Sequence, residues 1–320
     1  MMNALSFDGE VVVVTGAGGG MGRAHALDFA RRGARVVVND LGGHPFGHGS
    51  DPKLAEAVVE EIRAFGGEAV ANTQSVSDPD GAASLTADAM REWGRLDAVV
   101  SNAGIVRDVA FDDMTLKDFD DLVNVNLRGS MMVMQHAFKV MKANGGGRIV
   151  AVGSTSGLLG AASQVNYSSA KAGLLGCVRS MSIEGAPFGI RVNYVAPGAL
   201  DTRMSKALVG GLDVAPEDAG REDLVPVAPA LARLKAERVT PMVVALAHRE
   251  VSCSGQLMCA WGGQYSRASV FMNRGWIDRG DETTAEDVLA HWEEINDLSK
   301  VRDAGVDCFA HGSSNFQEVF

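Results

Sequence analysis

The chain has 320 residues, of which 46% are hydrophobic and 22% charged, and its formal net charge at pH 7 is −11. This composition excludes disorder as the dominant state, because the chain can bury a large core. The acidic balance excludes a general nucleic-acid binder and disfavours docking on anionic membranes, since both need clustered lysine and arginine.

Short β-branched runs alternate with segments of helical period over the first 260 residues. We predict strands at Val11–Val14, Arg35–Val38, Ala69–Ala71, Asp97–Val100, Arg148–Val152, Arg191–Val195 and Gln256–Trp261. We predict helices at Gly20–Arg32, Pro52–Phe65, Gly81–Trp93, Leu116–Lys142, Gln164–Gly185 and Lys235–His248. Unbroken valine runs are typical of parallel strands that helices cover on both faces. The alternation predicts an α/β fold with a doubly wound parallel sheet of the Rossmann type.

The pattern changes after about residue 265. We predict a dinucleotide-binding catalytic domain over residues 1–265 and a C-terminal helical extension over residues 266–320, packed on that domain. Thr283–Glu286 fits a helix capping box. Apolar residues follow at helical spacing, namely Val288, Leu289, Trp292, Ile295 and Leu298. A frayed end remains an equal alternative for residues 300–320.

Other signals are weak. The four cysteines form no C-x-x-C pair, so we expect neither a disulfide framework nor a metal site. No apolar run approaches the roughly 18 residues of a membrane span, and the N-terminus lacks the basic and apolar regions of a secretion signal. We therefore expect a cytoplasmic protein that binds neither membranes nor nucleic acid.

The turn after the first predicted strand is rich in glycine. It fits the pattern T-G-x-x-x-G-x-G from Thr15 to Gly22, immediately before a predicted helix. Glycines let backbone approach a pyrophosphate, and a helix N-terminus offers free N–H groups and a positive dipole end. We predict that this turn binds the phosphates of a dinucleotide through Gly16, Gly18, Gly20, Met21 and Gly22.

The second predicted strand leads into Asp40, 18 residues after Gly22. A carboxylate there can accept hydrogen bonds from the adenine-ribose hydroxyls, and it would repel a 2′-phosphate. The neighbouring positions Gly19 and Leu41 are not basic. We therefore predict NAD rather than NADP as the cofactor. His44 and His48 are interpreted as loop residues.

One of the three tyrosines, Tyr167, has a lysine four residues later, Lys171. On a helix this spacing puts both side chains on one face, one turn apart. An ammonium near a phenol favours the phenolate, so we expect Lys171 to lower the pKa of Tyr167 from about 10 toward neutrality. Such a phenol can transfer a proton at an alcohol or carbonyl oxygen. By itself the spacing also fits an exposed surface pair.

Ser154 adds a third member to this pair. It follows the strand predicted at Arg148–Val152 and precedes Tyr167 by 13 residues. The carboxyl ends of strands line the ligand crevice in a doubly wound sheet. A serine there can hydrogen-bond the reacting oxygen and stabilise charge that develops on it.

These motifs, taken in order, resemble the short-chain dehydrogenase/reductase family. The resemblance runs from about residue 7 to 262 and rests on Thr15–Gly22, Asp40, Ser101–Gly104, Asn124–Asn126, Ser154, Tyr167–Lys171 and Pro197–Gly198. It implies a catalytic tetrad of Asn126, Ser154, Tyr167 and Lys171. Ser154 would orient the substrate oxygen and Tyr167 would transfer its proton. Lys171 would also hold the nicotinamide ribose, and Asn126 would anchor a water of the proton relay.

The resemblance also implies further cofactor contacts. Asn102, Ala103 and Gly104 would lie beside the cofactor ribose. Pro197 and Gly198, with Thr202, would lie beside the nicotinamide amide. Ser101 replaces an asparagine usual in the family, and the acid usual after the third strand is absent. Ser75 and Val76 would take its place at the adenine.

Within the family the sequence resembles the (3R)-hydroxyacyl-CoA dehydrogenase domain of peroxisomal multifunctional enzyme type 2. The similar segments are Thr15–Ala26, Val36–Gly43, Ser101–Asp108, Arg238–Val244 and the long tail with Trp292. The resemblance implies an NAD-dependent (3R)-3-hydroxyacyl-CoA dehydrogenase acting on a fatty or steroid side chain. The alternatives are a dehydrogenase for a hydroxysteroid or another secondary alcohol without CoA, and a non-catalytic NAD-binding scaffold.

Substrate contacts are expected in two places. The segment at about residues 199–227 would form a substrate lid, in which Met204, Leu208, Val209 and Leu212 line an apolar pocket or pack within the lid. The candidates for the CoA phosphates are Arg203, Lys206, Arg233, Lys235, Arg267 and Arg274. Family members usually pair through the two long helices, so a homodimer or homotetramer is implied. The run Met131–Met134 belongs either to that interface or to the core.

Overall fold

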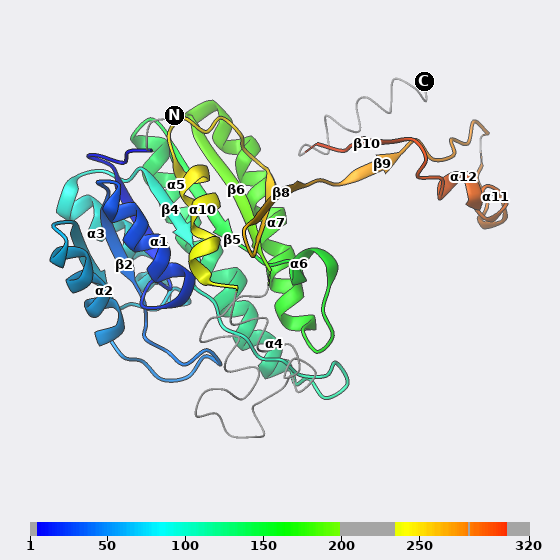
Figure 1. Ribbon diagram of the computed structural model, residues 1–320. Coiled ribbons are helices and arrows are strands. Elements are labelled where there is room, and N and C mark those ends of the chain that lie inside the picture. Colours follow the sequence, from blue (N-terminus) through cyan, green and yellow to red (C-terminus); the bar gives the residue numbers. More distant parts are fainter. Residues whose placement is uncertain (1–4, 199–233, 281, 306–320) are drawn as a thin grey trace. The chain divides into compact units, whose positions relative to one another are not determined.

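The computed structural model describes residues 5–198, 234–280 and 282–305 (Figure 1). Contacts divide the chain into two units, Met1–Ser266 and Arg267–Phe320. The strands that begin in the first unit are β1 (Val11–Thr15), β2 (Arg35–Asn39), β3 (Glu68–Asn72), β4 (Ala98–Ser101), β5 (Gly147–Val152), β6 (Ile190–Pro197), β7 (Leu257–Trp261) and β8 (Gln264–Ala268). Its helices are α1 (Gly20–Arg31), α2 (Lys53–Ala64), α3 (Pro79–Trp93), α4 (Leu116–Val123), α5 (Ser130–Ala143), α6 (Ser156–Leu159), α7 (Val165–Gly185) and α10 (Thr240–Ala247).

In the described part of the chain these strands form one sheet in the order β3-β2-β1-β4-β5-β6-β7-β8. Every neighbouring pair from β3 to β7 is parallel. The chain moves outward from β1 to β3, then crosses back to β4 and moves outward the other way. This order leaves a crevice between the loops that follow β1 and β4. The predicted doubly wound α/β sheet is confirmed.

Helices cover both faces of the sheet, which explains the unbroken valine runs. Helix α1 contacts both α2 and α10 on one face, whereas α5 contacts both α3 and α7 on the other. In Figure 1, α1 and α10 lie in front of the sheet. A buried cluster between the sheet and the α1 side includes Val12, Val36, Val100, Val150 and Phe29. Burying these side chains stabilises the fold by roughly 1.5–3 kcal/mol each.

Short polar signals set several helix ends. Helix α3 begins at Pro79 because the Asp78 carboxylate accepts a hydrogen bond from the Gly81 N–H at 2.7 Å, and proline is suited to the first helical position. Gly94 ends this helix with φ of +68°, a conformation that favours glycine. The helix therefore starts two residues earlier than the predicted Gly81.

Two predicted helices are interrupted. The helix expected over Leu116–Lys142 consists of α4 and α5 joined by a π-helical segment, η1 (Asn124–Gly129). The helix expected over Lys235–His248 is a 3₁₀ turn, η5 (Ala236–Arg238), followed by the shorter α10. Another 3₁₀ turn, η2 (Ala186–Phe188), follows α7.

The second unit contains helices where they were predicted, and it also contains strands, which the sequence analysis did not predict. It contains α11 (Ala285–Ala290) and α12 (Trp292–Ile295), together with the antiparallel pair β9 (Phe271–Asn273) and β10 (Val301–Asp303). The capping box lies one residue later than predicted, since Thr284 caps the Asp287 N–H. The helical spacing breaks at His291, between α11 and α12. Packing of this unit on the first stays a prediction.

None of the helices formed by the described residues has both the length and the apolar character that a membrane span requires.

Candidate active site

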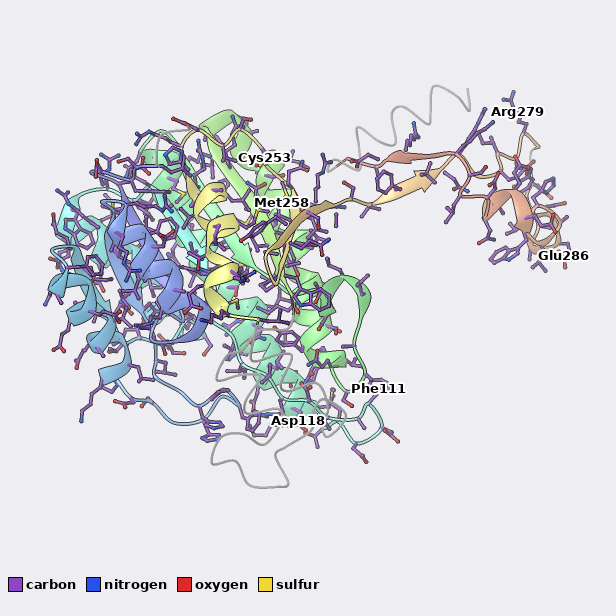
Figure 2. The ribbon with its side chains drawn as sticks, in the orientation of Figure 1. Phe111, Asp118, Cys253, Met258, Arg279 and Glu286 are labelled. Atoms are coloured by element: carbon purple, nitrogen blue, oxygen red, sulfur yellow. The ribbon has the colours of Figure 1, made fainter. Side chains whose placement is uncertain are left out.

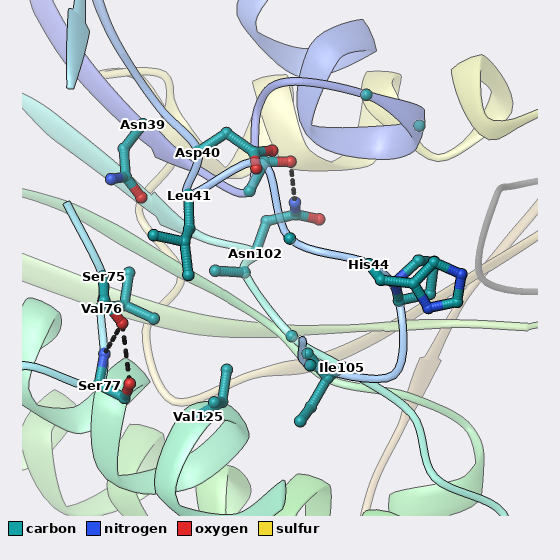
Figure 3. Close-up of a pocket in the computed structure, with 18 of the residues that line it drawn as sticks. Asn39, Asp40, Leu41, His44, Ser75, Val76, Ser77, Asn102, Ile105 and Val125 are labelled. Carbon is teal, nitrogen blue, oxygen red and sulfur yellow. Dashed lines mark hydrogen bonds between the residues drawn. The ribbon is translucent and has the colours of Figure 1, made fainter. Parts of the chain in front are cut away.

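A pocket opens at the carboxyl ends of β1 to β4, where ligands bind in doubly wound sheets (Figure 3). Most of the predicted cofactor residues line it: Gly16, Gly20, Met21, Asp40, Ser75, Val76, Asn102, Ala103 and Gly104. The lining also includes residues that the sequence did not single out as contacts, among them Leu41, His44, Ile105 and Val125. The structure therefore brings together in one concave site segments that are far apart in the sequence.

The glycine turn is too tight for side chains at two positions. A Cβ on Gly22 would lie 2.1 Å from the Gly16 carbonyl oxygen, and one on Gly16 would lie 2.8 Å from the Ala103 Cα. Gly16 and Gly20 also have positive φ values of +63° and +51°. Helix α1 begins at Gly20, and no side chain of the described residues caps its N-terminus. Its first N–H groups are therefore available to an anion in the pocket.

Thr15 and Asn102 fasten the end of β4 to this turn. The Thr15 hydroxyl oxygen accepts hydrogen bonds from the Asn102 and Ala103 N–H groups, both at 2.9 Å. The Asn102 amide in turn donates to the carbonyls of Thr15 at 2.9 Å and Gly16 at 3.2 Å. Its Oδ1 is buried with no hydrogen-bond partner among the described residues. The two loops of the crevice are thus held at a fixed separation.

Asp40 lies at the end of β2, on the pocket wall, as labelled in Figure 3. Its carboxylate accepts hydrogen bonds from the N–H groups of Gly18 and Gly42, both at 2.7 Å. These contacts fix the direction of the side chain and leave lone pairs for further donors. A Cβ on Gly18 would lie 2.9 Å from the Asp40 carboxylate carbon. Gly18 therefore shapes the turn around the acid.

Arg107 anchors the outer wall of the pocket. Its guanidinium donates to the Phe46 carbonyl at 3.1 Å, and it pairs with Asp118 at 3.2 Å and Asp121 at 2.9 Å. Asp118, labelled on α4 in Figure 2, also completes the capping box with Thr115. These bonds connect the segment after β2 to α4. Local sequence does not predict this anchor, because Arg107 is separated from Asp118 and Asp121 by 11 and 14 positions.

The proposed proton-transfer residues lie at the neighbouring strand end. Ser154 follows β5, and its hydroxyl lies close enough to the Tyr167 phenol on α7 for a hydrogen-bonding interaction that lowers the pKa of the phenol. Lys171 follows one turn later on α7, with its ammonium 5.7 Å from the centre of the Tyr167 ring. That ammonium is buried and donates to the Val152 carbonyl at 3.0 Å. The structure thus brings Ser154, Tyr167 and Lys171 together, as their spacing predicted.

The predicted effect on the tyrosine is wrong for this structure. Burial raises the pKa of Tyr167 to about 12, with the Asp108 carboxylate adding to the rise and the Ser154 hydrogen bond opposing it. Burial also lowers the pKa of Lys171 to about 8. The reason is that desolvation disfavours both the tyrosine phenolate and the lysine ammonium. The Lys171 ammonium also donates its hydrogen bond to the Val152 carbonyl rather than to the phenol.

Asn126 lies in η1 and is fully buried. Its side-chain oxygen accepts from the Ile105 N–H and its amide donates to the Ile105 carbonyl, both at 2.8 Å. The side chain therefore holds the segment after β4, and the expected role in anchoring a water stays a prediction. A Cβ on Gly104 would lie 3.2 Å from this side-chain oxygen, which explains the glycine.

Pro197 and Gly198 lie beside the Ser154 loop. The Pro197 carbonyl accepts from the Thr155 N–H at 3.0 Å. A Cβ on Gly198 would lie 2.5 Å from the Trp261 ring, so only glycine fits. Thr202, the expected lid at about residues 199–227 and its apolar residues lie outside the described residues.

Comparison with known proteins decides the family. The protein-family model described as short chain dehydrogenase matches residues 10–212 of this chain. The chain belongs to the short-chain dehydrogenase family. It is therefore an oxidoreductase, and this family uses NAD or NADP.

This short-chain dehydrogenase is similar to the following two relatives in sequence and to one solved structure in fold. The short-chain type dehydrogenase/reductase Rv0148 of Mycobacterium tuberculosis is 40% identical over 92% of this chain and 97% of its own length. The peroxisomal multifunctional enzyme type 2 of Mus musculus is 41% identical over 93% of this chain, which spans 38% of that enzyme. A 7α-hydroxysteroid dehydrogenase complexed with NADH and 7-oxo glycochenodeoxycholic acid has a TM-score of 0.70 and 29% identity, covering 82% of this chain and 98% of its own.

The pocket of this short-chain dehydrogenase fits a nicotinamide dinucleotide. The uncapped α1 N-terminus suits a pyrophosphate, and Asp40 suits ribose hydroxyls. The buried, unpartnered Oδ1 of Asn102 offers an acceptor beside the pocket.

Sequence reasoning missed several side chains that shape the site. Gln164 donates to both Asp108 carboxylate oxygens, at 3.0 and 2.9 Å, just before α7. Tyr194 on β6 is buried behind Ser154. A polar side chain inside an apolar strand is a signal that could have found Tyr194, because a buried tyrosine hydroxyl needs a partner. Nothing in the local sequence marks Gln164, because its partner lies 56 residues away.

Proposed function

We propose that this short-chain dehydrogenase oxidises the 3-hydroxyl of a (3R)-3-hydroxyacyl-CoA with NAD. The observation that carries the redox chemistry is that the Ser154 hydroxyl, at the end of β5, and the Lys171 side chain both lie beside the Tyr167 phenol of α7. Support for the substrate comes from the similarity to peroxisomal multifunctional enzyme type 2 over 93% of the chain, together with the hydroxyacyl-CoA activity that the sequence resemblance implies.

In this proposal each residue acts at a stated atom. The Ser154 hydroxyl donates a hydrogen bond to the substrate oxygen and stabilises the charge that develops there. The Tyr167 hydroxyl oxygen accepts the proton of the substrate hydroxyl, a contribution on the order of 10²–10⁴ in rate. The Lys171 ammonium, 5.7 Å from the centre of the Tyr167 ring, offsets part of the cost that burial imposes on the phenolate. When bound, NAD supplies the hydride acceptor and a positive charge, which favours the phenolate.

The pH dependence follows from the raised pKa of Tyr167, at about 12 in this structure. Proton abstraction needs the phenolate form of Tyr167. The kcat/KM for alcohol oxidation should therefore rise with pH until the pH exceeds the apparent pKa of Tyr167 in the enzyme–NAD complex. A bound positive charge lowers that apparent pKa.

NAD is proposed over NADP because Asp40 lies at the end of β2 with its carboxylate in the pocket wall. A 2′-phosphate beside this carboxylate would bring two negative charges together. Fixed hydrogen bonds from Gly18 and Gly42 prevent the side chain from turning away.

The CoA phosphates need positive charge near the mouth of the site. Lys235 is exposed just before η5 and is the described candidate in the first unit. In the second unit Arg267 pairs with Asp303 at 2.7 Å, and Arg274 is exposed. Arg203, Lys206 and Arg233 lie outside the described residues. Lys235 is therefore the first residue to test.

A second candidate is oxidation of a hydroxysteroid or another secondary alcohol without CoA. The observation that favours it is the similarity in structure to the 7α-hydroxysteroid dehydrogenase, with a TM-score of 0.70. Both candidates use the same proton-transfer residues, so they differ only in what holds the rest of the substrate.

Steady-state kinetics with a (3R)-3-hydroxyacyl-CoA, the matching free acid and a hydroxysteroid separates these candidates. We expect a kcat/KM at least tenfold higher for the CoA ester, which corresponds to about 1.4 kcal/mol of transition-state binding. Equal values with and without CoA, or faster turnover of the steroid, would favour the second candidate. Tyr167→Phe should abolish turnover and spare NAD binding. Unchanged turnover would refute the assigned role and favour a non-catalytic NAD-binding protein.

We also propose a homodimer or homotetramer, formed through α5 and α7. Val133 and Met134 are fully buried in the core, whereas Met131 is exposed on α5 and available to a partner. Sedimentation velocity tests the assembly. The cytoplasmic location expected from the sequence stays a prediction.

A further inference from the structure

Tyr194 connects two of the proposed catalytic residues through their backbone. It lies on β6, opposite Ala151 of β5, and its side chain has no exposed surface. Its hydroxyl oxygen accepts a hydrogen bond from the Ser154 N–H at 3.1 Å and donates to the Lys171 carbonyl at 3.0 Å. One phenol thus spans the loop after β5 and the turn of α7 that carries Lys171.

The ring is held in this place by its surroundings. A Cβ on Gly153 would lie 1.8 Å from the Tyr194 Cζ and 1.9 Å from its hydroxyl oxygen, so the ring occupies the space that this glycine leaves. On the far side of the Lys171 turn, a Cβ on Gly157 would lie 2.8 Å from the Lys171 backbone carbon. The turn is therefore confined between α6 and the Tyr194 hydroxyl.

The hydroxyl also stays protonated and can keep both bonds. Burial raises the pKa of Tyr194 far above the usual value for a tyrosine. A neutral phenol is one donor and an acceptor at once. This suits the backbone groups that it contacts: the Ser154 N–H, the Lys171 carbonyl and, at the longer distance of 3.4 Å, the Ser154 carbonyl.

We propose that Tyr194 is a positioning residue for the reaction: its hydroxyl fixes the Ser154 backbone against the Lys171 turn of α7, and so sets the separation of the Ser154 hydroxyl from the Tyr167 phenol. The inference rests on the proposed function, because it gives Ser154 and Tyr167 their catalytic roles. Misplacement of a reacting group by about 1 Å can cost on the order of 10²-fold in rate.

The test is Tyr194→Phe, which removes one oxygen and keeps the ring. Tyr265→Phe is the matched control, because the Tyr265 hydroxyl also donates to a backbone carbonyl, that of Arg238 at 2.8 Å, but contacts no proposed catalytic residue. We expect kcat for Tyr194→Phe to fall by roughly 10- to 100-fold with KM for NAD changed by less than about twofold, as for other groups that orient reacting ligands. Tyr265→Phe should retain wild-type kcat.

A pH profile separates positioning from simple loss of folded enzyme. The Ser154 hydrogen bond lowers the pKa of Tyr167, so a displaced Ser154 should move the apparent pKa of kcat/KM to higher pH. The fraction of folded enzyme scales the rate but does not move this pKa. A Tyr194→Phe profile that superimposes on the wild type, or a kcat equal to that of Tyr265→Phe, would overturn the inference.

A double-mutant cycle with Ser154→Ala tests the route of the effect. If Tyr194 acts through Ser154, the loss on Tyr194→Phe should be smaller in the Ser154→Ala background than in the wild type. If the kcat losses of the two single variants multiply in the double variant, Tyr194 does not act through Ser154. Tyr194→Met, which refills the volume without a hydroxyl, gives the same readouts should Tyr194→Phe not fold. If Ser154→Ala and Tyr167→Phe themselves keep full turnover, the proposed function fails first, and the two failures are thereby distinguished.

Discussion

Thr15 offers the sharpest test of how the cofactor crevice is held together. Its side chain is almost fully buried, and its hydroxyl oxygen accepts the N–H groups of Asn102 and Ala103, both at 2.9 Å. Thr15→Val replaces this oxygen by a methyl group of similar size. The strand keeps a β-branched residue, while two partly buried N–H groups lose their partner.

The size of the effect follows from these two bonds. A fully buried donor left unsatisfied costs about 1–3 kcal/mol. These two donors are only partly buried, so Thr15→Val should lower the free energy of unfolding by roughly 2 kcal/mol. Thr15→Ser is the matched control, because it keeps the hydroxyl and removes one methyl group. That loss should cost about 1 kcal/mol. The order of stability should therefore be Thr15, then Ser, then Val.

Urea denaturation followed by fluorescence measures these differences as shifts of the midpoint. Isothermal titration with NAD should show a higher Kd for Thr15→Val, because Asn102 and Ala103 line the pocket. The hydrogen-bond reasoning fails if the valine variant is as stable as the serine variant, or if the two bind NAD equally well.

Three further predictions concern other features of the first unit. Gly153→Ala should give little folded protein, since its Cβ would lie 1.8 Å from the Tyr194 ring; a circular dichroism melt like that of the wild type would contradict the close contact. Burial lowers the pKa of His25 to about 3, from 6.5 in an unfolded chain. Below pH 6.5, His25 is protonated in the unfolded chain but stays neutral in the folded protein. The free energy of unfolding is therefore unaffected by His25 above pH 6.5, and it falls by up to ~1.4 kcal/mol per pH unit as the pH decreases toward 3. His25→Gln should decline less than the wild type between pH 7 and 5 in urea midpoints, and parallel declines would contradict this. Asp40→Asn should raise kcat/KM with NADP relative to NAD by roughly tenfold or more, because a charge that repels the 2′-phosphate is gone; an unchanged ratio of the two cofactors would show that Asp40 does not select between them.

Much of the fold follows from local sequence. A valine run such as Val11–Val14 predicts a buried parallel strand because β-branched residues suit a sheet covered on both faces, and the structure extends it by one residue to Thr15. The pair Asp78-Pro79 shows a local signal that the prediction overlooked, since aspartate caps and proline begins α3.

The interruption of the long helix could not be predicted in this way. Asn126 uses both ends of its amide on the Ile105 backbone, 21 residues earlier in the chain. A contact with another element therefore accompanies the π-helical segment, whereas helical period and propensity describe only near neighbours. In the second unit, β9 and β10 pair although nearly thirty residues separate them in the chain. The spacing of apolar residues describes only near neighbours, so it could not predict this pair of strands.

For the site, local sequence is enough to predict which chemical groups are present and which lie one helical turn apart. Tyr167 and Lys171 share a face of α7 because four residues make about one turn. What surrounds them depends on how the elements pack together. Burial, rather than the neighbouring ammonium, governs the pKa of Tyr167, and the order of strands brings Tyr194 of β6 against Ser154 and Lys171. Desolvation and long-range hydrogen bonds depend on which segments meet in space, and no local pattern contains that information.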